Sequence, residues 1–142
     1  MRARKGADPN PVVAWTTDGK TLLFDQDGPD RKTSIKFLTM GADGKPVVHS
    51  EYAFQGNSAK VSPDGQWVAY YGEESGTAEV YVRQFPGPGG KVQISAQTGR
   101  VPRWSPNGRE LFYEENRSPE RLMAVDIPTG SHVQPGLPHV LF

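Results

Sequence analysis

A serine nucleophile is the first chemistry that the sequence can be searched for. Such a nucleophile usually needs a Gly-x-Ser-x-Gly turn, which exposes the hydroxyl at the end of a strand. The nearest matches are Gly56-Asn57-Ser58-Ala59-Lys60 and Gly72-Glu73-Glu74-Ser75-Gly76, and both have the wrong spacing. We therefore expect Ser75 to lie in a polar loop between strands, and we predict no catalytic residue in this chain.

Metal and phosphate sites are disfavoured for similar reasons. The three histidines, His49, His132 and His139, are not spaced as metal ligands on one element. The acidic segment 25–30 lacks the later glutamate of a calcium-binding loop. The glycine-rich segment 87–90 contains a proline that removes an amide needed to cradle phosphate, and no Lys-Ser/Thr pair follows it. We expect no metal and no cofactor.

The overall composition narrows the class of protein further. The chain has 142 residues and no cysteine, and its 16 basic residues balance its 16 acidic residues. The length fits one domain, and the absence of cysteine excludes disulfides and thiolate sites. Balanced charge argues against a nucleic-acid partner. Apolar runs of about four residues are far shorter than the roughly 20 of a membrane helix, so we expect no membrane insertion.

One sequence unit occurs three times. The copies are Ala14-Trp15-Thr16-Thr17-Asp18-Gly19, Lys60-Val61-Ser62-Pro63-Asp64-Gly65 and Arg103-Trp104-Ser105-Pro106-Asn107-Gly108, each followed by an apolar run. The marker glycines Gly19, Gly65 and Gly108 are separated by 46 and 43 residues. Proline presets the turn, Asp or Asn bonds the backbone two residues on, and glycine supplies a positive φ. These marker residues are therefore predicted to be structural, in hairpin turns between paired strands.

Two further landmarks keep the same phase in every copy. Apolar strands are predicted at 35–38, 80–82 and 122–125, and glycine-rich turns follow at 41–44, 86–90 and 128–130. A short strand is expected to begin after each turn, at Val47, Val92 and Val133. Four short strands in a repeat of this length are typical of a β-propeller blade. The prediction is an all-β chain: a single partial propeller over 1–142, with three four-stranded antiparallel blades at about 12–55, 56–98 and 99–142.

The repeat also resembles a known family. Trp104-Ser105-Pro106-Asn107-Gly108-Arg109-Glu110-Leu111-Phe112-Tyr113 resembles the repeat of TolB-type, WD-repeat-like β-propellers. The segment 79–95 is similar to blades of propellers that follow bacterial serine/threonine protein kinase domains. Related propellers precede prolyl-oligopeptidase-type hydrolase domains. The resemblance implies the fold and, for TolB-type proteins, the periplasm; it leaves the function open because one scaffold carries many functions.

Three blades are fewer than the four to eight that close a propeller. Two explanations are open: the chain is a piece of a longer propeller, or two copies pair into a six-bladed ring. The end of the sequence at Leu141-Phe142, within a motif, favours a piece.

A binding module is the function that this pattern predicts, with a protein or peptide as partner. Loops before the marker strands, 56–58 and 98–100, are expected to line one face. Trp15 and Trp104 share a repeat phase and are expected in the core, whereas Trp67 is out of phase and is expected to be more exposed. The candidate contact residues are Trp67, Glu73, Glu74, Arg100 and Arg103. The alternative is a sensor or accessory domain of a serine/threonine kinase or of a prolyl-oligopeptidase-type hydrolase.

Overall fold

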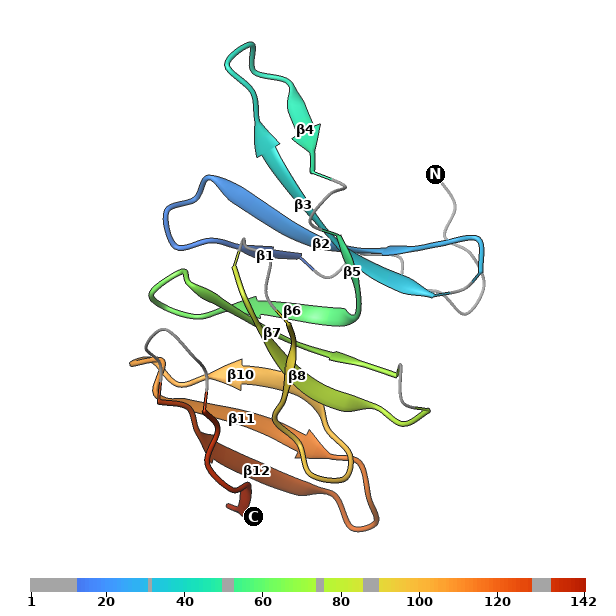
Figure 1. Cartoon of the computed structure of the whole chain (residues 1–142), viewed down its shortest axis with the longest axis vertical. Helices are drawn as coiled ribbons and strands as arrows, with labels where there is room; N and C mark the ends of the chain where they lie inside the picture. Colours follow the sequence, from blue (N-terminus) through green and yellow to red (C-terminus); the bar gives the residue numbers. More distant parts are fainter. Residues whose placement is uncertain (1–12, 31, 50–52, 74–75, 86–89, 129–133) are drawn as a thin grey trace.

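Three antiparallel sheets stack along the long axis of the molecule in chain order (Figure 1). The computed structural model describes residues 13–30, 32–49, 53–73, 76–85, 90–128 and 134–142. No helix occurs within these ranges, so no described segment is a long apolar helix of the kind that crosses a membrane. The predicted fold class is confirmed: the chain is a segment of a β-propeller whose ring is not closed.

Each sheet is one blade, in which strands that are neighbours in sequence pair with each other. The first blade contains β1 (Val13–Trp15), β2 (Thr21–Asp27), β3 (Thr33–Met40) and β4 (Pro46–Val48), and β5 (Phe54–Gln55) also pairs with β3. The second contains β6 (Asn57–Val61), β7 (Trp67–Gly72), β8 (Glu79–Gln84) and β9 (Val92–Gln93). The third contains β10 (Arg100–Trp104), β11 (Glu110–Glu115), β12 (Arg121–Asp126) and β13 (His139–Val140).

The apolar strands predicted after each marker are confirmed in β3, β8 and β12. The short strands expected at Val47 and Val92 are β4 and β9. The strand expected at Val133 lies outside the described residues, and within them the fourth strand of the third blade is β13, which pairs with β12 through Met123 and Ala124.

The marker turns form as their chemistry predicts. Asp18, Asp64 and Asn107 each accept a hydrogen bond through Oδ1 from the main-chain N–H two residues on, at 2.9, 3.1 and 2.9 Å. The glycines that follow have φ values of 71°, 76° and 73°, a region that glycine enters without a steric cost. A hydroxyl before each turn, on Thr16, Ser62 or Ser105, donates to the same Oδ1 atom. The marker residues therefore form the same hairpin turn in all three copies.

The hydrophobic core lies between the blades. Leu23, Ile35 and Phe37 of the first blade pack against Val68 and Tyr70 of the second. The opposite face of the second blade packs against the third in the same way. That second cluster contains Trp67, Ala69, Val80 and Val82 from the second blade and Leu111, Tyr113, Met123 and Val125 from the third. Each blade is thus stabilised by burial of apolar area against its neighbour, and the middle blade is covered on both faces.

The tryptophans correct two sequence-based expectations. Trp67 is only 6% exposed, because it begins β7 on the face that packs against the third blade. The expectation that it is the more exposed tryptophan is therefore wrong. Trp15, which was expected in the core, is 60% exposed. Its repeat equivalent Trp104 packs against the second blade, whereas no described blade precedes the first one to cover Trp15.

Candidate functional site

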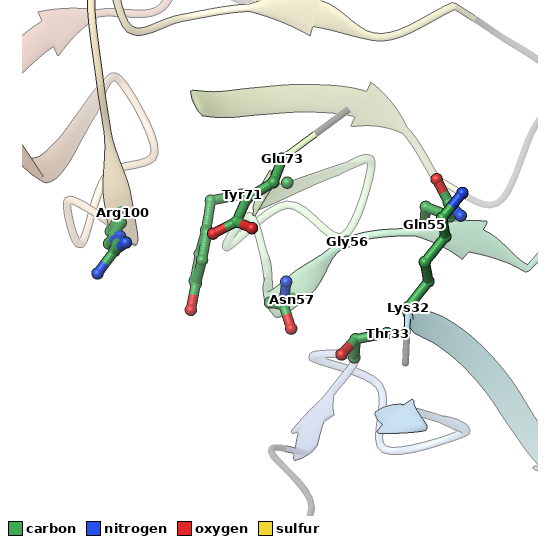
Figure 2. Close-up of a pocket in the computed structure, with 9 residues that line it drawn as sticks. Lys32, Thr33, Gln55, Gly56, Asn57, Tyr71, Glu73 and Arg100 are labelled. Atoms are coloured by element: carbon green, nitrogen blue, oxygen red, sulfur yellow. The ribbon is translucent and has the colours of Figure 1, made fainter. Parts of the chain in front are cut away.

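A groove of about 730 Å³ lies at one end of the blades. Its walls come from the start of β3, the β5–β6 junction, the end of β7 and the start of β10. The lining residues are Lys32, Thr33, Gln55, Gly56, Asn57, Tyr71, Gly72, Glu73 and Arg100. Figure 2 shows Arg100 and Tyr71 on one side of Asn57, and Thr33, Lys32 and Gln55 on the other. All three blades therefore contribute to a single surface.

A repeated β-bulge positions two of these side chains. In the second blade Asn57 pairs with Tyr71 but Lys60 pairs with Ala69, so β6 contains one extra residue. In the third blade the same shift occurs between Arg100 and Arg103 on β10. Bulges redirect side chains at the ends of strands. Asn57 and Arg100 occupy equivalent positions at the start of these bulged strands, and both reach the groove.

The bulges hold strained backbone beside the groove. Ser58 has a φ of 56° and Val101 a φ of 53°, a region that residues other than glycine adopt rarely. A β-branched residue such as Val101 is especially unfavourable there, at a cost on the order of 1–3 kcal/mol. The surrounding packing must maintain this conformation, so the two strand starts are held in a defined geometry.

A glycine precedes each bulge because an aromatic ring lies against it. A Cβ atom on Gly56 would approach the Tyr70 ring to 2.5 Å. A Cβ atom on Gly99 would approach the Tyr113 ring to 3.0 Å and the Val80 side chain to 2.9 Å. Tyr70 and Tyr113 are themselves buried, so the rings cannot move aside without loss of packing. The contacts of Gly56 with Tyr70 and of Gly99 with Tyr113 therefore determine where β6 and β10 begin at the groove.

Two charged residues, Asp25 of β2 and Lys60 of β6, interact between the first and second blades. The main-chain N–H of Ser58 donates to Asp25 Oδ2 at 3.1 Å, which ties the bulge of the second blade to β2 of the first. Burial raises the pKa of Asp25, and the Ser58 bond and the Lys60 ammonium partly oppose that rise. Asp25 Oδ1 is buried without a hydrogen-bond partner among the described groups. Burial and the nearby Arg103 lower the pKa of Lys60.

The groove offers charged and hydrogen-bonding side chains for recognition. Lys32, Glu73 and Arg100 are exposed, and none of their side chains pairs with another described residue. Asn57 and Gln55 add amide donors and acceptors, and Tyr71 adds a half-buried phenol. The nine described lining residues include no serine, cysteine or histidine that could act as a nucleophile or as its base. Nor does any group of three His, Asp or Glu residues within the described ranges have metal-site geometry.

The structure brings together some of the predicted contact residues. Glu73 and Arg100 line the same groove, and the 56–58 and 98–100 loops both reach it through Asn57 and Arg100. Arg103 is exposed on β10, outside the groove lining, with Nη1 donating to the Pro102 carbonyl oxygen at 3.1 Å. Trp67 is buried between blades and is not available as a surface contact. Glu74 and Ser75 lie outside the described residues.

Four lining residues were not anticipated from the sequence. Lys32 and Thr33 follow the acidic turn between β2 and β3, Gln55 ends β5, and Tyr71 lies near the end of β7. Tyr71 pairs with Asn57 of the preceding strand, β6, at the start of its bulge. Lys32, Thr33 and Gln55 reach the groove only because the first blade stacks on the second, which the sequence does not indicate.

Comparisons with known proteins agree on the fold. The sequence matches no protein-family model and none of the curated proteins. Among solved structures, TolB from Acinetobacter baumannii aligns with a TM-score of 0.70 at 18% identity, over 93% of this chain and 32% of its own. A TolB-type protein from Agrobacterium tumefaciens aligns with a TM-score of 0.71 at 19% identity, over 95% of this chain and 50% of its own. The β-propeller domain of the Trilobed protease from Pyrococcus furiosus aligns with a TM-score of 0.60 at 16% identity, over 92% of this chain and 42% of its own.

These likenesses show that the fold is that of a β-propeller segment. All three sequence identities are below 20%, so the likenesses concern the fold alone. The chain spans between about a third and a half of the TolB structures that it matches.

Proposed function

We propose that this chain is a non-catalytic binding module that holds an extended segment of a partner protein in the groove at the blade ends. The observation that carries the proposal is the meeting of unpaired polar side chains from three blades in one groove. Lys32 comes from the first blade, Asn57 and Glu73 from the second, and Arg100 from the third. Side chains without internal partners retain their hydrogen-bonding capacity for a ligand.

The chemistry of the groove indicates the kind of peptide. Two exposed cations, Lys32 and Arg100, flank the amides of Asn57 and Gln55. An extended peptide presents free N–H and C=O groups, which side-chain amides can bond. The guanidinium of Arg100 matches a carboxylate through two parallel hydrogen bonds. Glu73 lies beside Tyr71, on the Arg100 side of Asn57. Its negative charge disfavours a second acidic residue of the peptide on that side. The expected ligand is therefore an extended peptide with one acidic side chain directed to Arg100.

Selection from a displayed random-peptide library against the 142-residue protein tests this proposal. Enriched peptides should share an acidic residue, and Arg100→Ala should weaken the best of them by about tenfold or more, since a charge-assisted bond is lost. Arg109→Ala is the matched control, because Arg109 is also exposed but lies in a marker turn outside the groove. The absence of any enriched peptide, or equal losses in the two variants, would contradict the proposal.

A second candidate is the accessory propeller of a larger enzyme. The similarity to the β-propeller domain of the Trilobed protease supports it, because that propeller is a domain of a protease. The kinase-linked form of this proposal depends on the resemblance of segment 79–95. The genomic sequence on both sides of the segment that encodes these 142 residues distinguishes the two candidates. A hydrolase or kinase domain in the same reading frame favours the accessory role, and further blades bounded by stop codons oppose it.

A further inference from the structure

One face of the first blade carries an apolar row that crosses all four of its main strands. Trp15 pairs with Leu22, Leu22 with Leu38, and Leu38 with Val48, so the four side chains project to the same side of the sheet. Trp15 is 60% exposed and Val48 is 46% exposed, and the two leucines are half-buried. This row, which we call the open row, faces away from the second blade.

The central positions of the same row are buried in the other two blades. Its members in the third blade are Trp104, Leu111 and Val125, in register across three strands. Leu111 and Val125 are fully buried against the second blade, and Trp104 Nε1 donates to the carbonyl oxygen of Lys60 at 2.9 Å. In the second blade the central member, Val68, is fully buried against the first. The row is thus a blade–blade contact wherever a preceding blade is present.

We infer that the open row is a blade–blade interface, and that its occupant is the third blade of a second copy of this chain. Two such contacts related by a two-fold axis would join two three-bladed segments into a closed ring of six. The repeat equivalence specifies one bond of this interface. Trp15 corresponds to Trp104, and Arg103 corresponds to Lys60, so the Trp15 indole would donate to the Arg103 carbonyl oxygen of the other copy.

The partner surface in this inference is the outer face of the third blade, where Phe112 is half-buried and Ala124 is fully buried. Phe112 pairs with Arg103 and Ala124 and occupies the position that Leu23 has in the first blade, where it covers the second. Glu110 and Asp126 pair with each other at one end of this face, and Glu114 lies at the other. The open face of the first blade contributes Lys36, which is in register with Phe24. Lys36 is opposite in charge to the three carboxylates of the third-blade face, which also carries the exposed Arg103 beside Phe112.

Light scattering coupled to size exclusion tests the inference on the full 142-residue protein. We expect a single species of about 31 kDa, twice the 15.6 kDa of one chain. Val48→Lys places a charge within the open row and should raise the dimer dissociation constant about a hundredfold or more. Val47→Lys is the matched control: Val47 is on the same strand with 43% exposure, but it pairs with Thr39 on the opposite face. It should change the constant less than about threefold.

Tryptophan fluorescence gives a second, independent measurement. Accessibility of Trp15 to acrylamide should fall on dimerisation in the wild type, and Trp15→Phe should abolish that change. A monodisperse monomer, a series of larger open assemblies, or equal effects of the two lysine variants would overturn the inference. A stable monomer would instead indicate that a blade from a longer chain occupies the open row.

Discussion

The indole Nε1 of Trp104 donates a 2.9 Å hydrogen bond to the main-chain carbonyl oxygen of Lys60, 44 residues earlier in the chain. This bond joins the first strand of the third blade to the first strand of the second, close to one repeat apart. Together with the Ser58–Asp25 bond between the second and first blades, it sets how adjacent blades are stacked. The groove is made from the starts of these same strands, so blade stacking determines its shape.

Loss of the Trp104 donor should weaken the stack. Trp104→Phe keeps an aromatic ring but leaves the Lys60 carbonyl oxygen without this partner, and we expect the free energy of unfolding to fall by about 1–2 kcal/mol. Urea unfolding in the Val48→Lys background measures the effect without a contribution from association. Trp15→Phe in that background is the control, with a change within about 0.5 kcal/mol, because Trp15 is largely exposed there. Equal destabilisation by both variants would contradict the assigned role of the bond.

The glycine before the third-blade bulge should be intolerant of a methyl group. In Gly99→Ala the new Cβ would lie 2.8 Å from Ser95 Cβ and 2.9 Å from Val80 Cγ2, so we expect a loss of about 1–3 kcal/mol from overpacking. Gly90→Ala is the control, because no heavy atom lies within 4 Å of a Cβ built there. Thermal and urea unfolding of the two variants give the comparison, and a Gly99→Ala protein as stable as the control would show that the packing at this position is loose.

The buried carboxyl of Asp25 should make stability depend on pH in a particular direction. Burial raises the pKa of Asp25 above its ordinary value of 3.8, so the folded state binds its proton more tightly than the unfolded state does. The contribution of Asp25 to stability is then complete below pH 3.8 and is lost as pH rises through the raised pKa. At neutral pH the ionised group is unfavourable, with the Ser58 bond and Lys60 as partial compensation.

Asp25→Asn keeps an acceptor for the Ser58 N–H and removes the ionisation. We expect the variant to gain stability relative to the wild type as pH rises from about 4 towards neutrality, because only the wild type must expel a proton from a buried site. Urea unfolding of both proteins across this pH range is the measurement. A difference between them that stays constant, or that favours the wild type as pH rises, would show that the Lys60 attraction outweighs burial.

Local turn chemistry explains why much of the fold could be predicted. The hydrogen bonds of Asp18, Asp64 and Asn107 to the N–H two residues on need no tertiary contact, so the sequence specifies them fully. Three copies in phase then indicate the four-strand unit and, through it, the propeller.

Exposure could not be predicted in the same way, since it depends on which faces have a neighbouring blade. Trp67 is buried because its face meets the third blade, and Trp15 is exposed although it occupies the same repeat position as Trp104. For the groove, Glu73 and Arg100 could be proposed from loop positions. Lys32 and Gln55 could not, because they reach the groove only through the stacking of the first blade on the second.

Chemical-shift mapping of an enriched peptide on the labelled protein tests the central claim, that the groove is the binding surface. Binding in the groove should shift the amide resonances of Asn57, Tyr71 and Arg100, together with the Arg100 side-chain Nε–H. The protein carries a smaller cleft of about 500 Å³ beside Asn107, Glu110 and Asp126, which serves as an internal reference. Shifts confined to the groove are the predicted result. Shifts centred on the smaller cleft, with Asn57 and Arg100 unmoved, would contradict the proposed function.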